Sequence, residues 1–465
     1  MMGNYHVRFL EGWGCGDTPL PTRHIPLPLR EFAQQFRKVF KHPKQREYFE
    51  IILTGLIASE NRTLAGIHQR LVEDVDYGGL HHFMADSPWD HDALRQARLD
   101  WTAKRLQSDS GDPKVIAIDS TLVHHYGEQI HGVYWYYDYV NHNFCLGQKL
   151  VAATYVSPRT TVPLGMEVYH RGFLNEQKLY LQETKPAAAA GQEEWDEFHS
   201  LVKQYEENCE LHRTQLDLAG DLVDECERHA IPVDAYALDG AFLDIELMDK
   251  IESYGRAWVT RLAKNRHVQL RSGKFDTVEV LAKSLPKEVF KPVVLRTKAG
   301  EERTYWVFAT NTKVKFWKKL RVVISYDNAE LEGEPRFFVS NKLNWTQAQK
   351  ILQPYMFRDP IEHFFRDGKQ ELGFENCQQR KKQAVLRYWE LCFVAYTYLE
   401  LICQVDYPEG MTPFVTDTIG QKCRSTEMKL LQAFITTVKN VILEGKDPKE
   451  LLDLLTKKRL NGFAC

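Results

Sequence analysis

The sequence of 465 residues predicts an α/β fold in which a layered sheet carries an inserted β-rich subdomain and lies between two helical flanks. Three observations support this prediction. Short apolar segments of strand type alternate with helical segments between residues 111 and 266. Strand-like segments, separated by breaks such as Ala299-Gly300 and Glu332-Gly333, dominate residues 267–345. Helical periodicity dominates the chain on both sides of these two regions.

The N-terminal region, residues 1–110, is predicted to be helical after an irregular arm. Gly and Pro are frequent in residues 1–28, which disfavours regular structure there. Apolar periodicity and start signals then predict helices beginning near Leu29 and Lys44, and helices over Thr63 to Val72 and Trp89 to Leu106. Several short helices are typical both of DNA-binding bundles and of packing modules, so we expect a DNA-binding region without excluding the second role.

Residues 111–266 are predicted to form the first part of an α/β core. The expected strands are Lys114 to Asp119, His131 to Tyr139, Cys145 to Val156, Val233 to Asp239 and Ala257 to Leu262. Helices are expected over Glu193 to His229, with a possible break, and over Ala241 to Ser253. The order of three strands, helix, strand, helix, strand predicts a five-stranded mixed sheet that begins with antiparallel neighbours.

The chain beyond residue 266 is predicted to leave the core and return to it. The inserted subdomain, residues 267–345, has expected strands over Pro292 to Thr297, Thr304 to Ala309, Leu320 to Ser325 and Arg336 to Val339. Helix resumes at Thr346, so residues 346–375 form the second part of the core and residues 376–465 a helical C-terminal region. The most apolar stretch, Val385 to Cys403, is interrupted by three charged residues and therefore predicts a buried helix, not a membrane span.

Composition narrows the class of protein. The formal net charge is −3 and the pI about 6.6, but nine Lys and Arg against two acids lie between Lys291 and Arg321. Such a run suits phosphate binding, although a solvated surface gives the same pattern. The nine cysteines contain no C-x-x-C pair, which favours a reducing cytoplasm over a disulfide framework. We expect a cytoplasmic protein with no membrane contact.

The segment from Pro354 to Gly373 carries the strongest chemical signal. Its residues Tyr355, Arg358, Glu362 and Lys369 fall on one narrow stripe if the segment is a single helix. A carboxylate suits a hard metal ion and the neighbouring cations suit phosphate oxygens, so the stripe indicates phosphodiester chemistry. The alternative is structural: Asp359-Pro360-Ile361-Glu362 is typical of a helix start, in which Glu362 closes a capping box.

Two further acids follow predicted strands. Asp119 and Asp239 each come where a strand is expected to end, at the edge where α/β sheets place ligands. Together with Glu362 they would offer three carboxylates, which select Mg²⁺ or Mn²⁺. Taken singly, Asp239-Gly240 is also typical of a tight turn and Asp119-Ser120 of a helix cap.

These motifs resemble those of a known family. The sequences I-D-S at 118–120, L-D-G-A-F at 238–242, R-L-A-K-N-R at 261–266 and the Tyr-(2)-Arg-(3)-Glu-(6)-Lys spacing that starts at Tyr355 are similar to the DDE transposases of bacterial insertion sequences. The resemblance covers roughly residues 114–372. It implies an RNase H-like catalytic core in which the metal-binding catalytic residues are Asp119, Asp239 and Glu362. Pro360 departs from the family pattern, so the residue at which the helix carrying Glu362 begins is not determined by the resemblance.

The resemblance also implies cofactors, partners and a nucleoid-associated location in a prokaryotic cytoplasm. Two ions of Mg²⁺ or Mn²⁺ would assist strand cleavage at the ends of the element, and the freed 3′-hydroxyl would attack target DNA. The partners would be double-stranded DNA, at terminal inverted repeats and at the target, and a second copy of the chain on that DNA. The implied DNA-binding residues are Tyr355, Arg358, Lys369, Arg261, Lys264, Trp306 and Trp317. The two tryptophans would stack on a flipped base, whereas a role in the hydrophobic core is the simpler alternative.

Three rival functions remain open on the sequence. A transposase that has lost catalysis could persist as a DNA-binding protein, although the three acids disfavour this. A carboxylate-pair glycosidase is disfavoured by the cations at Arg358 and Lys369. A zinc hydrolase could use His124, His125, His131 and His142, but their spacing fits no zinc motif.

Overall fold

The computed structural model describes residues 25–70, 75–139, 141–344, 347–407 and 417–443. The irregular arm expected over residues 1–28 lies almost entirely outside them, as do the end of the helix expected over Thr63 to Val72 and the start expected at Thr346. Within the described residues, no helix combines the length and the apolar character that crossing a membrane requires.

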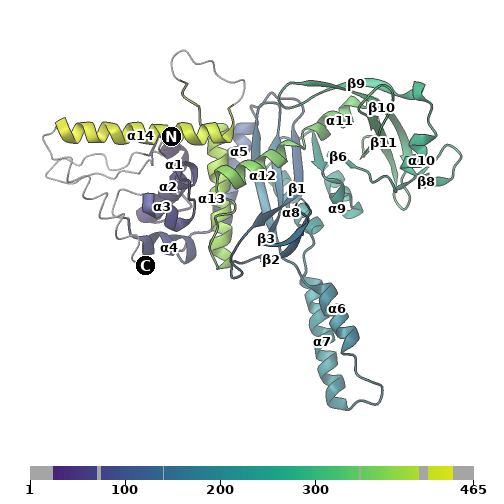
Figure 1. The fold of residues 1–465 in the computed structure, drawn as a ribbon, viewed down its shortest axis with the longest axis horizontal. Helices are drawn as coiled ribbons and strands as arrows, with labels where there is room; N and C mark the ends of the chain where they lie inside the picture. Colours follow the sequence, from purple (N-terminus) through teal and green to yellow (C-terminus); the bar gives the residue numbers. More distant parts are fainter. Residues whose placement is uncertain (1–24, 71–74, 140, 345–346, 408–416, 444–465) are drawn as a thin grey trace.

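The centre of the molecule is one ten-stranded mixed sheet (Figure 1). Its strands are β1 (Val115–His124), β2 (Val133–Asp138), β3 (Asn143–Val156), β4 (Thr161–Tyr169), β5 (Ala235–Leu238), β6 (Ala257–Arg261), β9 (Lys291–Arg296), β10 (Glu302–Lys313), β11 (Lys319–Tyr326) and β12 (Arg336–Ser340). The order is β2-β3-β1-β5-β6-β12-β11-β10-β9, and β4 pairs with the second half of β3. A separate hairpin joins β7 (His267–Gln269) to β8 (Phe275–Thr277).

The first half of the sheet carries the predicted core. The antiparallel strands β4, β3 and β1 are followed by β5 and β6, which run parallel to β1. This arrangement is consistent with the RNase H-like core expected from the motifs. Along β1 the side chains alternate between two hydrophobic clusters, Val115 and Ala117 facing one and Ile116 and Ile118 the other. Both faces of this strand are therefore buried under helices.

The strands of the expected insertion extend this same sheet. All four predicted strands are present as β9 to β12, but β12 pairs antiparallel with β6, so the meander continues the core sheet. The expected five strands therefore underestimate the sheet, and β4 was also not predicted. The physical reason lies in β6, where Trp258 and Val259 are buried and need a paired neighbour on their outer side. The apolar strand β12 supplies it.

Helices of the middle region lie against the sheet or project from it. They are α6 (Leu174–Glu183), α7 (Gln192–Leu211), α8 (Gln215–Arg228), the short η1 (Gly240–Phe242), α9 (Ile245–Ser253), α10 (Val278–Lys283) and η2 (Lys287–Val289). The helix expected over Glu193 to His229 is broken, because Thr214 and Asp217 form a capping box that starts α8. The pair α6–α7 buries no side chain and projects away from the body (Figure 1).

The N-terminal and C-terminal helices share one hydrophobic core. The N-terminal set is α1 (Leu27–Gln34), α2 (Pro43–Ala58), α3 (Leu64–Arg70), α4 (Tyr77–Ala85) and α5 (His91–Leu106). The later set is α11 (Gln349–Met356), α12 (Pro360–Glu371), α13 (Lys382–Leu401) and α14 (Ile419–Leu443). The helix α13 is buried along most of its length, as predicted, and packs against α2, α4, α5 and β4. The two helical flanks therefore support the sheet as one unit.

Candidate active site

Adjacent parallel strands place Asp119 beside Asp239. The pairing of β1 with β5 runs from Val115↔Ala235 to Ile118↔Leu238, so each aspartate follows the last paired residue of its strand. The expectation that the first strand ends at Asp119 is wrong, because β1 continues to His124 through its pairing with β3. Asp119 is thus held inside a strand and is no helix cap. Asp239 caps η1, accepting a hydrogen bond from the Ala241 amide at 3.2 Å.

The motif segment is two helices, not one. The helix α11 ends at Met356, residues 357–359 form a turn, and α12 starts at Pro360, so the single helical stripe is wrong. Pro360 occupies the first helical position, where its missing N–H costs nothing. The capping box, weighed as the structural alternative for Glu362, is absent: the Asp359 side chain makes no cap hydrogen bond, and Glu362 accepts from Arg358. The turn between α11 and α12 interrupts the helix, but it places the motif residues Tyr355 and Glu362 around Arg358.

Arg358 is that centre. Its guanidinium donates to the Asp119 carboxylate at 2.5 Å and to the Glu362 carboxylate at 2.7 Å. Burial alone would lower the pKa of Arg358, but Asp119, Tyr355 and Glu362 outweigh burial and raise it, so the residue stays charged. Two acids from β1 and from the first turn of α12 are therefore joined by one buried cation.

Asp119 is the acid most affected by its surroundings. Burial raises the pKa of its carboxyl to about 6, against the lowering effect of Arg358, and the charges of Asp239 and Glu362 raise it further. The three acids thus interact electrostatically. Lys149 of β3 also lies close enough for Asp119 to counteract the lowering of the Lys149 pKa by burial. Sequence reasoning missed Lys149, although a lysine within an otherwise apolar strand was a usable signal.

Tyr355 and Lys369 flank the acids. The Tyr355 ring packs edge-on against Phe338 at 4.8 Å between centroids, and its buried hydroxyl has no hydrogen-bond partner among the described residues. Burial raises the Tyr355 pKa to about 12, so the hydroxyl keeps its proton and remains available as a donor. Lys369 donates to the Leu122 carbonyl at 2.7 Å, which fixes α12 along β1.

The three carboxylates are chemically suited to a hard divalent cation. Asp119 and Glu362 present oxygen to one buried positive group, and Asp239 stands beside them on the neighbouring strand. Within the described part of the chain, the triad is not among the groups whose ligand atoms all lie within 4.8 Å of one another. Since Arg358 lies between two of its members, closing the triad around a cation requires the guanidinium to move.

Among the other predicted DNA-binding residues, Arg261 lies next to Gly240 and its charge acts on Tyr355, so it borders this centre. Lys264 and the two tryptophans have other partners. Arg261 is exposed at the end of β6, and Lys264 pairs with Glu334 at 3.3 Å. Trp317 stacks on Trp258 with centroids 5.7 Å apart, and Trp306 of β10 packs against the same hydrophobic cluster. Both tryptophans therefore pack against the hydrophobic core, which was the alternative to stacking on a base.

The basic run of residues 291–321 is partly neutralised. Ion pairs join Arg296 to Glu302, Lys298 to Glu400 and Lys318 to Asp249 and Glu252. The four histidines of the rival zinc site do not form one group of closely spaced ligand atoms within the described residues. His125 forms a hydrogen bond with Gln148, and His131 packs against His170.

Comparison with known proteins agrees with this geometry. The family described as DDE superfamily endonuclease matches residues 35–277, and the transposase DDE domain matches residues 212–398. A probable transposase for insertion sequence element IS701 from Microchaete diplosiphon is 26% identical over 355 residues, which cover 74% of this chain and 80% of the relative. The first match spans more than half of the chain and includes Asp119 and Asp239, and the second includes Glu362. The chain belongs to the DDE superfamily of endonucleases and carries the DDE domain of transposases.

Proposed function

We propose that the chain is the transposase of an insertion sequence, which cuts DNA at the element's ends and joins the freed 3′-hydroxyl to target DNA. The observation that carries this proposal is the Arg358 bridge. It gathers Asp119 and Glu362, far apart in sequence, beside Asp239. Carboxylates for a metal and cations for phosphates then lie within one site, as phosphodiester cleavage requires.

Asp119, Asp239 and Glu362 are proposed to hold two divalent ions, Mg²⁺ or Mn²⁺. The ions would activate the attacking water or hydroxyl and stabilise the leaving oxygen of the phosphodiester. Asp119 must be ionised for this role, and Arg358 favours that form against the effect of burial.

The remaining residues are proposed to position DNA. Arg358, once released from the carboxylates, presents a planar guanidinium that suits two phosphate oxygens. Tyr355 offers its unpaired hydroxyl as a neutral donor. Lys369 and Lys149 place positive charge along β1 on the side of the acids. Arg261 is proposed to contact DNA beside Tyr355, and Lys264 three residues further along the chain. Base stacking by Trp306 or Trp317 would require that tryptophan to leave its contacts with the hydrophobic cluster.

The test is cleavage of duplex DNA that carries the ends flanking this gene. Wild-type chain with Mg²⁺ should nick these ends, and Asp119→Asn should bind them with similar affinity but cut at least about 1,000-fold more slowly, since a metal ligand is lost. Asp234→Asn, at the opposite end of β5 from Asp239, is the matched control and should cut normally. Equal cutting by Asp119→Asn, or cutting in EDTA, would refute the proposed site.

The rival proposal is a DNA-binding protein without catalysis. It predicts binding to the same ends with no cleavage by wild-type chain under any divalent ion. The same assay therefore separates the two functions.

A further inference from the structure

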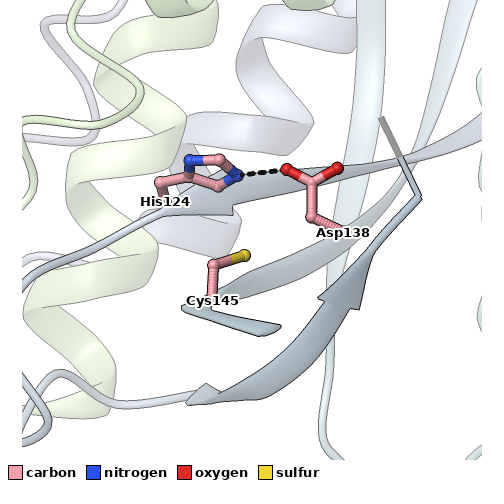
Figure 2. Close-up of side chains that lie close together, drawn as sticks. All are labelled: His124, Asp138 and Cys145. Carbon is pink, nitrogen blue, oxygen red and sulfur yellow. Dashed lines mark ion pairs between the residues drawn. The ribbon is translucent and has the colours of Figure 1, made fainter. Parts of the chain in front are cut away.

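Three side chains of metal-binding type meet at the far end of β1. His124 ends β1, Asp138 ends β2 and Cys145 lies in β3, and their ligand atoms all lie within 4.8 Å of one another (Figure 2). His124 is five residues beyond Asp119, a distance of roughly 17 Å along an extended strand. The cluster is therefore separate from the carboxylates of the candidate active site.

The strand pairing explains why these residues meet. On one edge β3 pairs with β1, where Gly147 faces His124, and on the other it pairs with β2, where Cys145 faces Tyr136 and Asn143 faces Asp138. The three ligands thus come from three adjacent strands, whose pairing brings them together. A preformed group of this kind lowers the cost of gathering ligands around an ion.

The geometry fits a tetrahedral ion. His124 Nε2 lies 3.1 Å from an Asp138 carboxylate oxygen. Nitrogen and oxygen ligands of Zn²⁺ at their usual bond lengths are separated by roughly 3.3 Å. The sulfur of Cys145 points toward this pair (Figure 2). Three protein ligands would leave one position for water.

Asn141 supports the carboxylate. Its backbone N–H donates to one Asp138 oxygen at 3.2 Å and its side-chain amide donates to the other at 2.8 Å. Partners of this kind fix the orientation of a ligating carboxylate and are a regular part of metal sites.

We propose that His124, Asp138 and Cys145 bind one Zn²⁺ or a similar first-row divalent ion. A set of nitrogen, oxygen and sulfur donors prefers such a borderline ion to Mg²⁺, which favours oxygen alone. Binding takes Cys145 as its thiolate and releases the thiol proton to solvent. An ion pair between His124 and Asp138 accounts for two of the residues, whereas the ion accounts for all three and for the role of Asn141.

The ion would fasten β1 to the β2–β3 hairpin next to the motif lysine. Lys369 donates to Leu122, two residues before His124, and the charges of Asp138 and Cys145 act on its pKa. Zn²⁺ would neutralise the carboxylate and thiolate and leave Lys369 to interact with phosphate. This consequence rests on the proposed function, but the binding of the ion does not.

Cobalt replacing zinc tests the thiolate directly. Metal-free full-length chain titrated with Co²⁺ should develop the near-ultraviolet absorption of cobalt–thiolate charge transfer at one ion per chain. Cys145→Ser should lose this band. Cys209→Ser removes an exposed cysteine outside the cluster and should keep it. His91→Ala disrupts Asp90–His91–Asp92, another group with closely spaced ligand atoms, and should also keep it. Absence of the band in wild type, or its survival in Cys145→Ser, overturns the proposal.

Zinc affinity, measured by competition with a chromophoric chelator, tests the supporting residue. Asn141→Ala should weaken zinc binding about 10- to 100-fold. Asn143→Ala, an exposed asparagine two residues further on, should not. Asp119→Asn should retain the zinc, so failure of the proposed catalytic site leaves this result unaffected. Zinc should raise the melting temperature of wild type and not of Cys145→Ser; an equal rise in both would place the ion elsewhere.

Discussion

At the residue scale, one arginine compensates the negative charge of two carboxylates in the candidate site. Arg358 serves two carboxylates, and Glu362 is 59% exposed while Asp119 is largely buried. The acids were predictable from sequence because each follows a local signal, a strand in two cases and a helix start in the third. Arg358 was predicted as a phosphate ligand. Its ion pair with Glu362 has the local i,i+4 spacing, whereas its ion pair with Asp119 depends on tertiary packing that no local pattern contains.

Glu362→Gln separates a metal ligand from a structural residue. The side chain is exposed and caps nothing, so we expect the free energy of unfolding to change by less than about 1 kcal/mol. Cleavage should be lost because the negative charge is lost. Glu371→Gln, on the same helix, is the control and should cut normally. Melting and cleavage assays of both variants test this. If Glu362→Gln cuts normally and Glu371→Gln does not, Glu371 is the third acid instead.

The pH dependence of stability reports on Asp119. Burial raises its pKa to about 6, above the usual 3.8, so the folded chain binds more protons than the unfolded chain between these values. This contribution is complete below the unfolded pKa and is lost as pH rises through about 6. Relative to Asp119→Asn, wild type should lose up to about 3 kcal/mol of unfolding free energy between about pH 4 and pH 7. Urea unfolding in EDTA measures it, and parallel curves would contradict it.

At the scale of elements, Arg387 joins α13 to the N-terminal helical segment. This side chain is fully buried and donates to the backbone carbonyls of Phe83, Met84, Ser87 and Trp89. The apolar pattern predicted α13 as a buried helix but not its partners, because the pattern records burial and not which surface covers it. The same limit concealed the pairing of β12 with β6.

Arg387→Leu should be strongly destabilising. It removes the Arg387 donors from all four carbonyls, although Trp89 still donates to those of Phe83 and Ser87. The Met84 and Trp89 carbonyls lose the donor that Arg387 provides. Each such loss costs about 1–3 kcal/mol, so we expect a total of roughly 3 kcal/mol or more. Lys382→Leu, at the exposed start of α13, should stay within about 0.5 kcal/mol of wild type. Denaturant unfolding of both variants makes the comparison. Similar small losses would show that Arg387 is dispensable for joining the two flanks.

At the scale of the whole molecule, segments that are distant in sequence pack on one another. The helical flanks, expected as residues 1–110 and 376–465, meet in one hydrophobic cluster that also includes one face of the sheet. The expected insertion continues the sheet through β12. The fold class was therefore predictable from the alternation of strands and helices. The packing of distant segments was not predictable, because contacts between distant residues produce no periodic pattern in the local sequence.

Two copies should assemble on paired ends. One chain offers one carboxylate triad, whereas transposition must process both ends of an element together. Light scattering of the chain with DNA containing two ends should give at least two chains per complex. DNA with one end serves as the reference. A single chain on paired ends would exclude the expected dimer.

If the carboxylates and Arg358 have the roles proposed above, the Arg358 bridge would make ion binding and DNA binding depend on each other. A guanidinium that holds Asp119 and Glu362 blocks the cation and is itself unavailable to phosphate. A phosphate that draws Arg358 away frees the carboxylates, and a cation that takes the carboxylates frees Arg358. Each ligand then increases the affinity for the other, and by thermodynamic linkage the two increases are equal. Such cooperativity would keep the nuclease inactive in the absence of DNA, because the site would bind the divalent ion only weakly until DNA is bound.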